Sequence, residues 1–189
     1  MTKQIFTFLF LLIFPSLVFS QGGTVIADKG FGVVAVDKKM SSIKSYLVAI
    51  DKSKLRDSSD AAGVGDEYSS AWNVDLKKAK MESYFGQKVT SVEVYFDYAY
   101  DNQGEQTKNE IVARFIVYFE APKDKEDEIG FQAKLMVYYG DAIMAQTDDK
   151  KDIMNFTWFS DVTLLQVNFG YDGEKKSDVY AAYFGRSKG

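Results

Sequence analysis

The sequence predicts an α+β domain in which helices pack on a mainly antiparallel sheet. Two observations carry this prediction. The first is a pair of segments, 89–100 and 111–119, in which residue types alternate as they do along half-buried strands. The second is a series of apolar residues from Met40 to Ile50, spaced at three and four positions, which is typical of one helix face.

The two alternating segments are expected to form an antiparallel hairpin, because the intervening Asp101-Asn102-Gln103-Gly104 is rich in turn-forming residues. One face of the first strand is expected to hold Val92, Val94, Phe96, Tyr98 and Tyr100. One face of the second is expected to hold Ile111, Ala113, Phe115, Val117 and Phe119, opposite Val112, Arg114, Ile116 and Tyr118. Both faces are largely apolar, so the second face is either covered or a binding surface.

The segment from Lys123 to Gly140 fits two structures. Ile129–Tyr139 alternates as a strand does, but the acidic start and the closing glycine are typical of a helix N-terminus and C-cap. We predict a helix here, with a strand as the alternative.

The remaining elements follow shorter patterns. A helix is expected over Lys39–Ile50, and Asp51–Gly65 and Asp148–Asp152 are expected to be polar loops. Strands are expected at Trp72–Leu76, Met81–Phe85, Phe156–Trp158, Val162–Phe169 and Val179–Phe184. The order of helix, loop, Trp-led strand and further strands recurs, so the single domain expected at 21–189 is divisible into possible halves, 21–120 and 121–189.

The first twenty residues predict export. Lys3 precedes an apolar run from Ile5 to Phe14, and Val18-Phe19-Ser20 precedes Gln21 as a cleavage site would. The run is too short for a membrane span, which needs about 20 apolar residues. We therefore expect a signal peptide at 1–20 and a periplasmic or secreted protein. The chain has no cysteine, so neither disulfides nor a lipid anchor is expected.

Composition argues against several function classes. The chain has no histidine and no cysteine, which removes the usual catalytic triads and dyads and imidazole metal sites. The formal net charge is −4 and no basic run occurs, so nucleic-acid binding is not expected. We expect a protein that is not an enzyme and has no cofactor. The acidic residues near Asp148 are interpreted as solvated loop charge rather than a metal site.

Aromatic residues are the candidate binding groups, because the chain has 12 Tyr and 15 Phe. Tyrosine and tryptophan favour the centres of interfaces. The candidate binding residues are Tyr95, Tyr118, Tyr138 and Trp158. The function they predict is binding of another protein through an aromatic sheet face. The alternative is a carrier that holds a small apolar ligand between helix and sheet.

Two stretches resemble a known superfamily. Leu135–Gly140 is followed by Trp158 and two expected strands, and Phe31-Gly32 precedes Met40-Ser41-Ser42-Ile43-Lys44. This order is similar to the repeats of the beta-lactamase-inhibitor-protein-like superfamily, which includes the SmpA-type outer-membrane assembly proteins. The resemblance implies helices on an antiparallel sheet and protein binding. The chain departs from it in lacking a lipobox cysteine and in having Lys39 where a glycine is usual.

Overall fold

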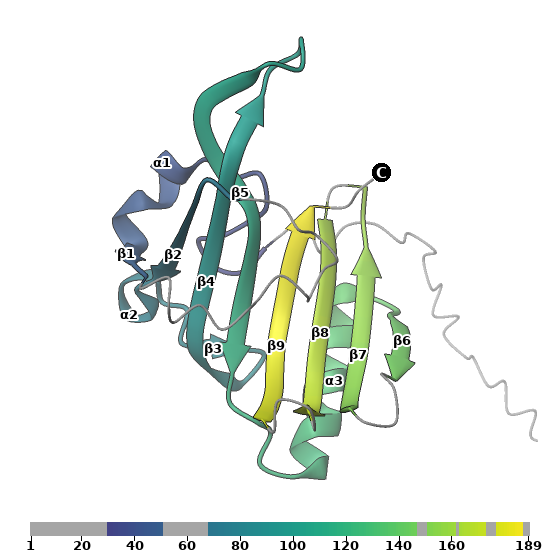
Figure 1. Cartoon of the computed structure of the whole chain (residues 1–189). Helices are drawn as coiled ribbons and strands as arrows, with labels where there is room; N and C mark the ends of the chain where they lie inside the picture. Colours follow the sequence, from purple (N-terminus) through teal and green to yellow (C-terminus); the bar gives the residue numbers. More distant parts are fainter. Residues whose placement is uncertain (1–29, 51–67, 147–150, 162, 173–176, 187–189) are drawn as a thin grey trace, which may run out of the picture.

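A single antiparallel sheet forms the centre of the fold, which confirms the predicted α+β class (Figure 1). The computed structural model describes residues 30–50, 68–146, 151–161, 163–172 and 177–186. The strands follow the order β1-β2-β4-β5-β9-β8-β7-β6, and the short β3 pairs with β4. The expected signal peptide, the expected loop at 51–65 and most of the expected loop at 148–152 lie outside the described residues.

Each half of the chain contributes one continuous set of strands to the sheet. The first half contains α1 (Met40–Ile43), η2 (Lys44–Tyr46), β1 (Leu47–Ala49), β2 (Ser70–Val74), α2 (Leu76–Ala79), β3 (Ser83–Tyr84), β4 (Gln87–Tyr100) and β5 (Gln106–Phe119). The second contains α3 (Lys125–Tyr139), β6 (Ile143–Gln146), β7 (Lys151–Phe159), β8 (Thr163–Asp172) and β9 (Ser177–Arg186). Because β5 pairs with β9, the sheet continues across the boundary between the two possible halves.

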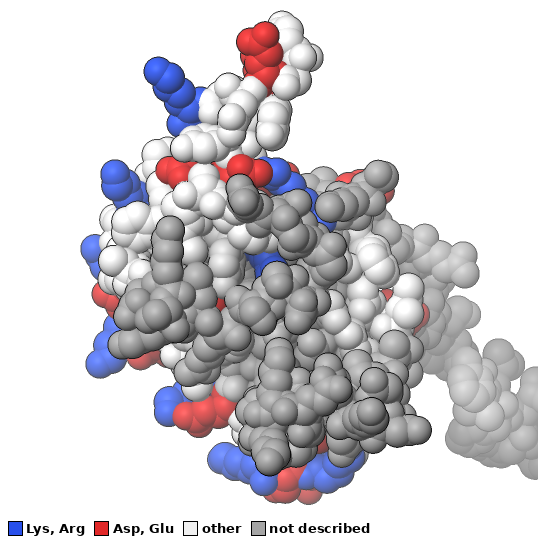
Figure 2. All heavy atoms as spheres, in the orientation of Figure 1, with Lys and Arg blue, Asp and Glu red and all other residues white. Residues whose placement is uncertain are grey.

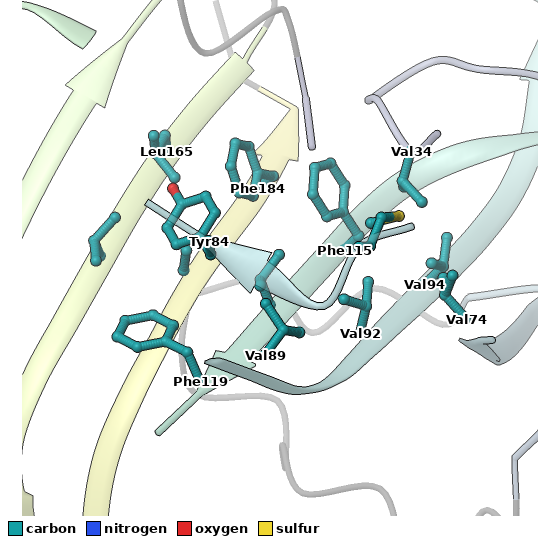
Figure 3. Packing of buried hydrophobic residues seen from close by; sticks show 14 of the residues in the cluster. Val34, Val74, Tyr84, Val89, Val92, Val94, Phe115, Phe119, Leu165 and Phe184 are labelled. Carbon is teal, nitrogen blue, oxygen red and sulfur yellow. The ribbon is translucent and has the colours of Figure 1, made fainter. Parts of the chain in front are cut away.

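The main core lies between the sheet and the helical layer. Phe131 and Leu135 of α3 are fully buried in it, and so is Ile43 of α1. The sheet contributes Val92, Val94, Phe115, Leu165 and Phe184, whose side chains gather on one face (Figure 3). The rings of Phe115 and Phe184 stack 4.3 Å apart across the β5–β9 junction. This contact joins the contributions of the two halves into one core.

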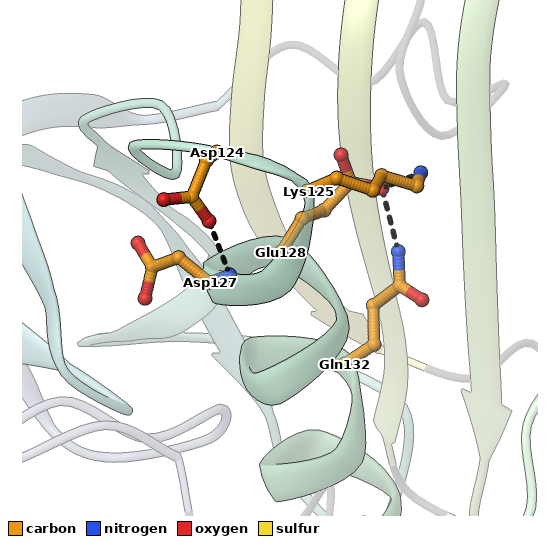
Figure 4. Close-up of polar contacts among 5 residues, drawn as sticks. All are labelled: Asp124, Lys125, Asp127, Glu128 and Gln132. Atoms are coloured by element: carbon orange, nitrogen blue, oxygen red, sulfur yellow. Dashed lines mark hydrogen bonds and ion pairs between the residues drawn. The ribbon is translucent and has the colours of Figure 1, made fainter.

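The segment with two possible structures is a helix, α3, as predicted. Asp124 caps its N-terminus, with the side-chain Oδ1 accepting a hydrogen bond from the backbone N–H of Asp127 at 2.9 Å (Figure 4). Three acidic residues in the first turn favour the positive end of the helix dipole. At the other end Gly140 has a φ of +82°, and its N–H donates to the Met136 carbonyl. Local capping residues therefore set both ends of this helix.

Replacing Asp124 tests the cap directly. Asp124→Ala leaves the Asp127 N–H without its acceptor and is expected to cost about 1 kcal/mol of unfolding free energy. For a protein of this size that loss lowers Tm by about 2–4 °C, measured by thermal denaturation. Asp124→Asn keeps an acceptor oxygen and should lose less. Equal Tm values for the parent and Asp124→Ala would contradict the capping role.

One predicted face pattern is wrong in the hairpin. Tyr95 pairs with Arg114 and Phe96 with Val112, so Ala113 is the extra residue of a β-bulge. The bulge shifts the alternation by one position. As a result Val112 is fully buried in the main core, although the sequence pattern placed it on the opposite face.

Several element boundaries also differ from the prediction. Lys151 and Asp152 belong to β7 rather than to a loop, and β3 covers only Ser83–Tyr84 of the strand expected over Met81–Phe85. Two further differences have clear physical causes. The helix expected over Lys39–Ile50 ends at Tyr46, because the next three residues form β1 and pair with β2. The strand expected to reach Leu76 ends at Val74, since Asp75 caps α2 by accepting a hydrogen bond from the Lys78 N–H at 3.1 Å. Pairing with a strand distant in sequence overrides the local helical spacing in the first case. A capping residue ends the strand in the second.

Candidate functional site

The first two candidate residues lie on the outer face of the sheet, opposite the helical layer. Tyr95 on β4 is 6 % exposed, and Tyr118 on β5 is half-buried. They pack in a second, smaller cluster with Ile116, Ala181 and Tyr183. Figure 2 views the molecule from this side, and the described charges visible in it include acidic atoms at the tip of the β4–β5 hairpin and Lys or Arg side chains along the side of β1 and β2.

A buried carboxyl group organises this outer cluster. Glu93 is 3 % exposed, and its Oε2 accepts hydrogen bonds from the Tyr95 hydroxyl at 2.8 Å and the Tyr118 hydroxyl at 3.4 Å. Arg114 is also buried, with its guanidinium carbon 5.4 Å from the ring centre of Tyr95 and 5.9 Å from that of Tyr183. Burial, then the charge of Glu93, raises the pKa of Tyr95 well above its ordinary value. The cluster is therefore a packed polar network with buried aromatic rings.

The other two candidates lie on the helical side of the sheet. Trp158 on β7 is only 5 % exposed, and its indole N–H donates to the Gly140 carbonyl at 2.9 Å. This bond ties the end of α3 to β7, so Trp158 belongs to the core. Tyr138 near the end of α3 is 41 % exposed. The four candidates thus do not form one surface: Tyr95 and Tyr118 share the outer face, and Tyr138 lies with other aromatic residues.

Those other residues form an aromatic pocket of about 420 Å³. Its lining comes from three separate segments of the chain. The lining residues are Gly30, Phe31, Gly32, Tyr84, Phe85, Tyr138 and Tyr139. Tyr84 and Tyr139 are buried and form the floor, whereas Phe31, Phe85 and Tyr138 are partly or largely exposed and form the walls. The volume lies within the range of small-molecule sites in proteins.

Consecutive ring contacts connect the walls to the floor. The Phe31 ring packs edge-on against Tyr84 at 5.2 Å, and Tyr84 packs edge-on against Phe85 at 4.8 Å. Phe85 in turn contacts the rings of Tyr138 at 5.1 Å and Tyr139 at 5.6 Å. Phe31 and Tyr138 therefore stand at the two ends of this series of rings.

Two glycines shape the wall formed by Phe31. Gly30 and Gly32 have φ values of +66° and +56°, and Phe31 and Val34 form a β-bridge across the turn. A Cβ atom on Gly30 would lie 2.2 Å from the Val34 carbonyl oxygen, and one on Gly32 would lie 2.5 Å from the Met81 side chain. Only glycine fits these positions, so the close turn that presents Phe31 requires both.

A strained turn presents Phe85. Phe85 and Gly86 form the two-residue connection between β3 and β4, with Tyr84 paired to Gln87 on either side of it. The φ values are +50° for Phe85 and +99° for Gly86. Positive φ at both positions matches a type I′ hairpin turn, which favours Asn-Gly, Asp-Gly or Gly-Gly. A bulky residue in this conformation costs about 1–3 kcal/mol.

The hydroxyl groups of the two buried tyrosines, Tyr84 and Tyr139, pair with each other. The Tyr84 and Tyr139 oxygens lie 3.3 Å apart and share a hydrogen bond. Burial, the largest effect, raises the pKa of both phenols far above the ordinary value, so both stay protonated near neutral pH. The lining residues are glycine, phenylalanine and tyrosine alone. This set favours binding of an apolar ring over acid–base chemistry.

The sequence interpretation missed most of this pocket. From the sequence, Phe31 was named only for a family resemblance. Tyr84, Phe85 and Tyr139 were not predicted to bind a ligand. A signal was present, because aromatic residues adjoin glycine in each contributing segment. These segments are Gly30-Phe31-Gly32, Tyr84-Phe85-Gly86 and Tyr138-Tyr139-Gly140.

Two searches of the described part of the chain bear on other kinds of site. Within residues 30–50 and the later described ranges, no three Asp or Glu residues are grouped as a metal site would need. Asp148 and Asp149, two of the acidic residues that the sequence assigns to solvated loop charge, lie outside the described residues. Of the helices that the structure describes, none combines the length and apolar character that a membrane span needs.

Comparison with protein-family models, with characterised proteins and with solved structures finds no significant match for this chain. The resemblance to the beta-lactamase-inhibitor-protein-like superfamily therefore stays a prediction.

Proposed function

We propose that this protein is a non-catalytic carrier that binds a small apolar, ring-containing ligand in the aromatic pocket. The observation that carries the proposal is the pocket itself, in which five aromatic residues from three chain segments line an open hollow of about 420 Å³. Apolar and aromatic walls with a few placed polar groups are typical of small-molecule sites.

The main function predicted from the sequence, protein binding through the sheet face, has less support than its alternative, the carrier. Such a surface needs exposed aromatic rings. Tyr95 is buried, Tyr118 is half-buried and hydrogen-bonded to Glu93, and Trp158 is a core residue. The pocket, by contrast, has partly exposed walls, including Tyr138 and Phe31. The ligand-binding function is therefore preferred.

The proposed compartment rests on the signal peptide expected at the N-terminus. A signal peptide at 1–20 would deliver the protein to the periplasm or the exterior, as the apolar run behind Lys3 indicates. There it would hold apolar molecules that water solvates poorly.

Titration with the neutral aromatic probe N-phenyl-1-naphthylamine tests the proposal. The purified protein is expected to bind the probe saturably, with a fluorescence increase as the probe enters the pocket. Tyr138→Ala removes an exposed wall and should weaken binding about tenfold, which corresponds to about 1.4 kcal/mol. Tyr138 is 41 % exposed, so the fold should tolerate the change.

Val137→Ala is the matched control, because Val137 lies on the same helix, is 88 % exposed and does not line the pocket. It should bind the probe as the parent does. Binding that does not saturate, or that is equal in the parent and Tyr138→Ala, would reject the pocket as the ligand site.

A further inference from the structure

Phe85 has a backbone conformation that is unusual for an aromatic residue. Its position in the β3–β4 turn, with φ of +50°, suits asparagine or glycine far better than an aromatic residue. Each local choice in a natural sequence tends to agree with the fold, and exceptions concentrate where function requires them. The Phe85 side chain must therefore supply something that asparagine at this turn would not.

The ring of Phe85 occupies the middle of the pocket wall. It contacts the ring of Tyr84 on one side and those of Tyr138 and Tyr139 on the other. The turn is also joined to α3, because the Lys134 ammonium group donates to the Phe85 carbonyl at 3.3 Å. The half-buried Phe85 ring thus contacts both the buried rings of Tyr84 and Tyr139 and the exposed ring of Tyr138, and its turn is bonded to α3.

The angles between these rings point to the kind of ligand. Phe85 meets Tyr84 at 81°, Tyr138 at 65° and Tyr139 at 63°, so its contacts are all edge-to-face. Edge-to-face packing gains electrostatic energy from aromatic partners beyond the burial of apolar area. A planar aromatic ligand can extend this pattern, whereas an alkyl chain gains only from burial.

We propose that Phe85 is held in a left-handed backbone conformation to give the pocket its selectivity for ligands that carry a planar aromatic ring. The inference rests on the proposed ligand-binding function and names the ligand class and the residue that selects it.

Two substitutions separate backbone strain from the role of the ring. Phe85→Asn and Phe85→Ala both remove the ring, but only asparagine is well accommodated at positive φ. Phe85→Asn is therefore expected to melt roughly 2–4 °C above Phe85→Ala, since strain is relieved in the first alone. Both variants should bind N-phenyl-1-naphthylamine at least about tenfold more weakly than the parent protein.

A third substitution tests selectivity. Phe85→Leu keeps an apolar side chain of similar bulk but has no ring, and it remains informative if the smaller replacements do not fold. Its affinity for N-phenyl-1-naphthylamine is expected to fall about tenfold. Its affinity for dodecanol, an alkyl-chain probe measured by displacement of the dye, should stay within about twofold of the parent value.

The outcomes distinguish this inference from the function on which it rests. If the parent protein does not bind the aromatic probe, the proposed function fails. If the parent binds the probe and Phe85→Asn binds it equally well, the function stands and the role of Phe85 is overturned. Equal losses of dye and dodecanol affinity in Phe85→Leu would overturn the selectivity for aromatic rings.

Discussion

Raising the pH above 10 is expected to unfold this protein steeply. Tyr84, Tyr95, Tyr139 and Tyr183 are all at least nine-tenths buried, and burial is the largest cause that raises the pKa of each phenol. In the unfolded chain these phenols ionise near pH 10, but in the folded protein they stay protonated to higher pH. The folded state therefore binds more protons than the unfolded state above pH 10, and its stability falls as the pH rises.

The expected effect is large because the four tyrosines act together. Each phenol that ionises only on unfolding costs about 1.4 kcal/mol of stability per pH unit above its unfolded pKa. Together the four groups lower the free energy of unfolding by several kcal/mol per pH unit, against a total of about 5–15 kcal/mol for a typical domain. Below pH 10 this stabilisation is fully present. Denaturant titrations at a series of pH values measure the slope.

Single Tyr→Phe substitutions provide the control. Tyr84→Phe removes one buried ionisable group and should make the slope above pH 10 shallower by about 1.4 kcal/mol per pH unit. Tyr100→Phe should leave the slope as it is, because the Tyr100 side chain is 60 % exposed on the hairpin. Tyrosinate absorbance that reaches the value for all 12 tyrosines while the protein stays folded would show that the four phenols are accessible, contrary to this expectation.

Replacing Phe131 with alanine is expected to be the most destabilising single change in the helical layer. Phe131 of α3 is fully buried, and its ring lies 5.1 Å from that of Phe119 and 5.9 Å from that of Phe169. Removing a buried phenylalanine ring typically costs about 3–5 kcal/mol, from lost burial and the cavity that remains. Phe131→Ala should therefore lower the denaturant midpoint strongly while leaving the slope of the transition unchanged.

Val137→Ala on the same helix is the comparison. Because Val137 is 88 % exposed, this change should alter the free energy of unfolding by no more than about 0.5 kcal/mol. A loss below about 1 kcal/mol in Phe131→Ala would mean that α3 does not pack on the sheet through this ring.

Local rules were sufficient for the longest elements. The hairpin strands β4 and β5 carry period-two patterns, and the turn between them is fixed by Asp101, whose Oδ1 accepts hydrogen bonds from the N–H groups of Gln103 and Glu105. The helix α3 has a capping aspartate at one end and Gly140 at the other. In each case the residues that decide the structure lie within a few positions of one another, so the sequence displays them together.

The candidate site was less predictable, because tertiary contacts choose between faces that look alike in sequence. Tyr95 and Tyr138 were selected for the same reason, as aromatic residues able to bind a partner. Packing on the outer face left Tyr95 6 % exposed in contact with Glu93, whereas Tyr138 remained 41 % exposed beside the pocket. Periodicity assigns a residue to a face, but it does not say what covers that face.

The sequence by itself determined the α+β class, the antiparallel hairpin and the capped helix α3, because these depend on periodicity and on hydrogen bonds between near neighbours. Tertiary structure decided the bulge at Ala113, the strand β1 and the aromatic pocket. Each of these requires residues far apart in the chain to meet, as Phe31, Tyr84 and Tyr139 do. No local pattern encodes such a meeting, because it depends on how the sheet pairs and on which side the helix packs.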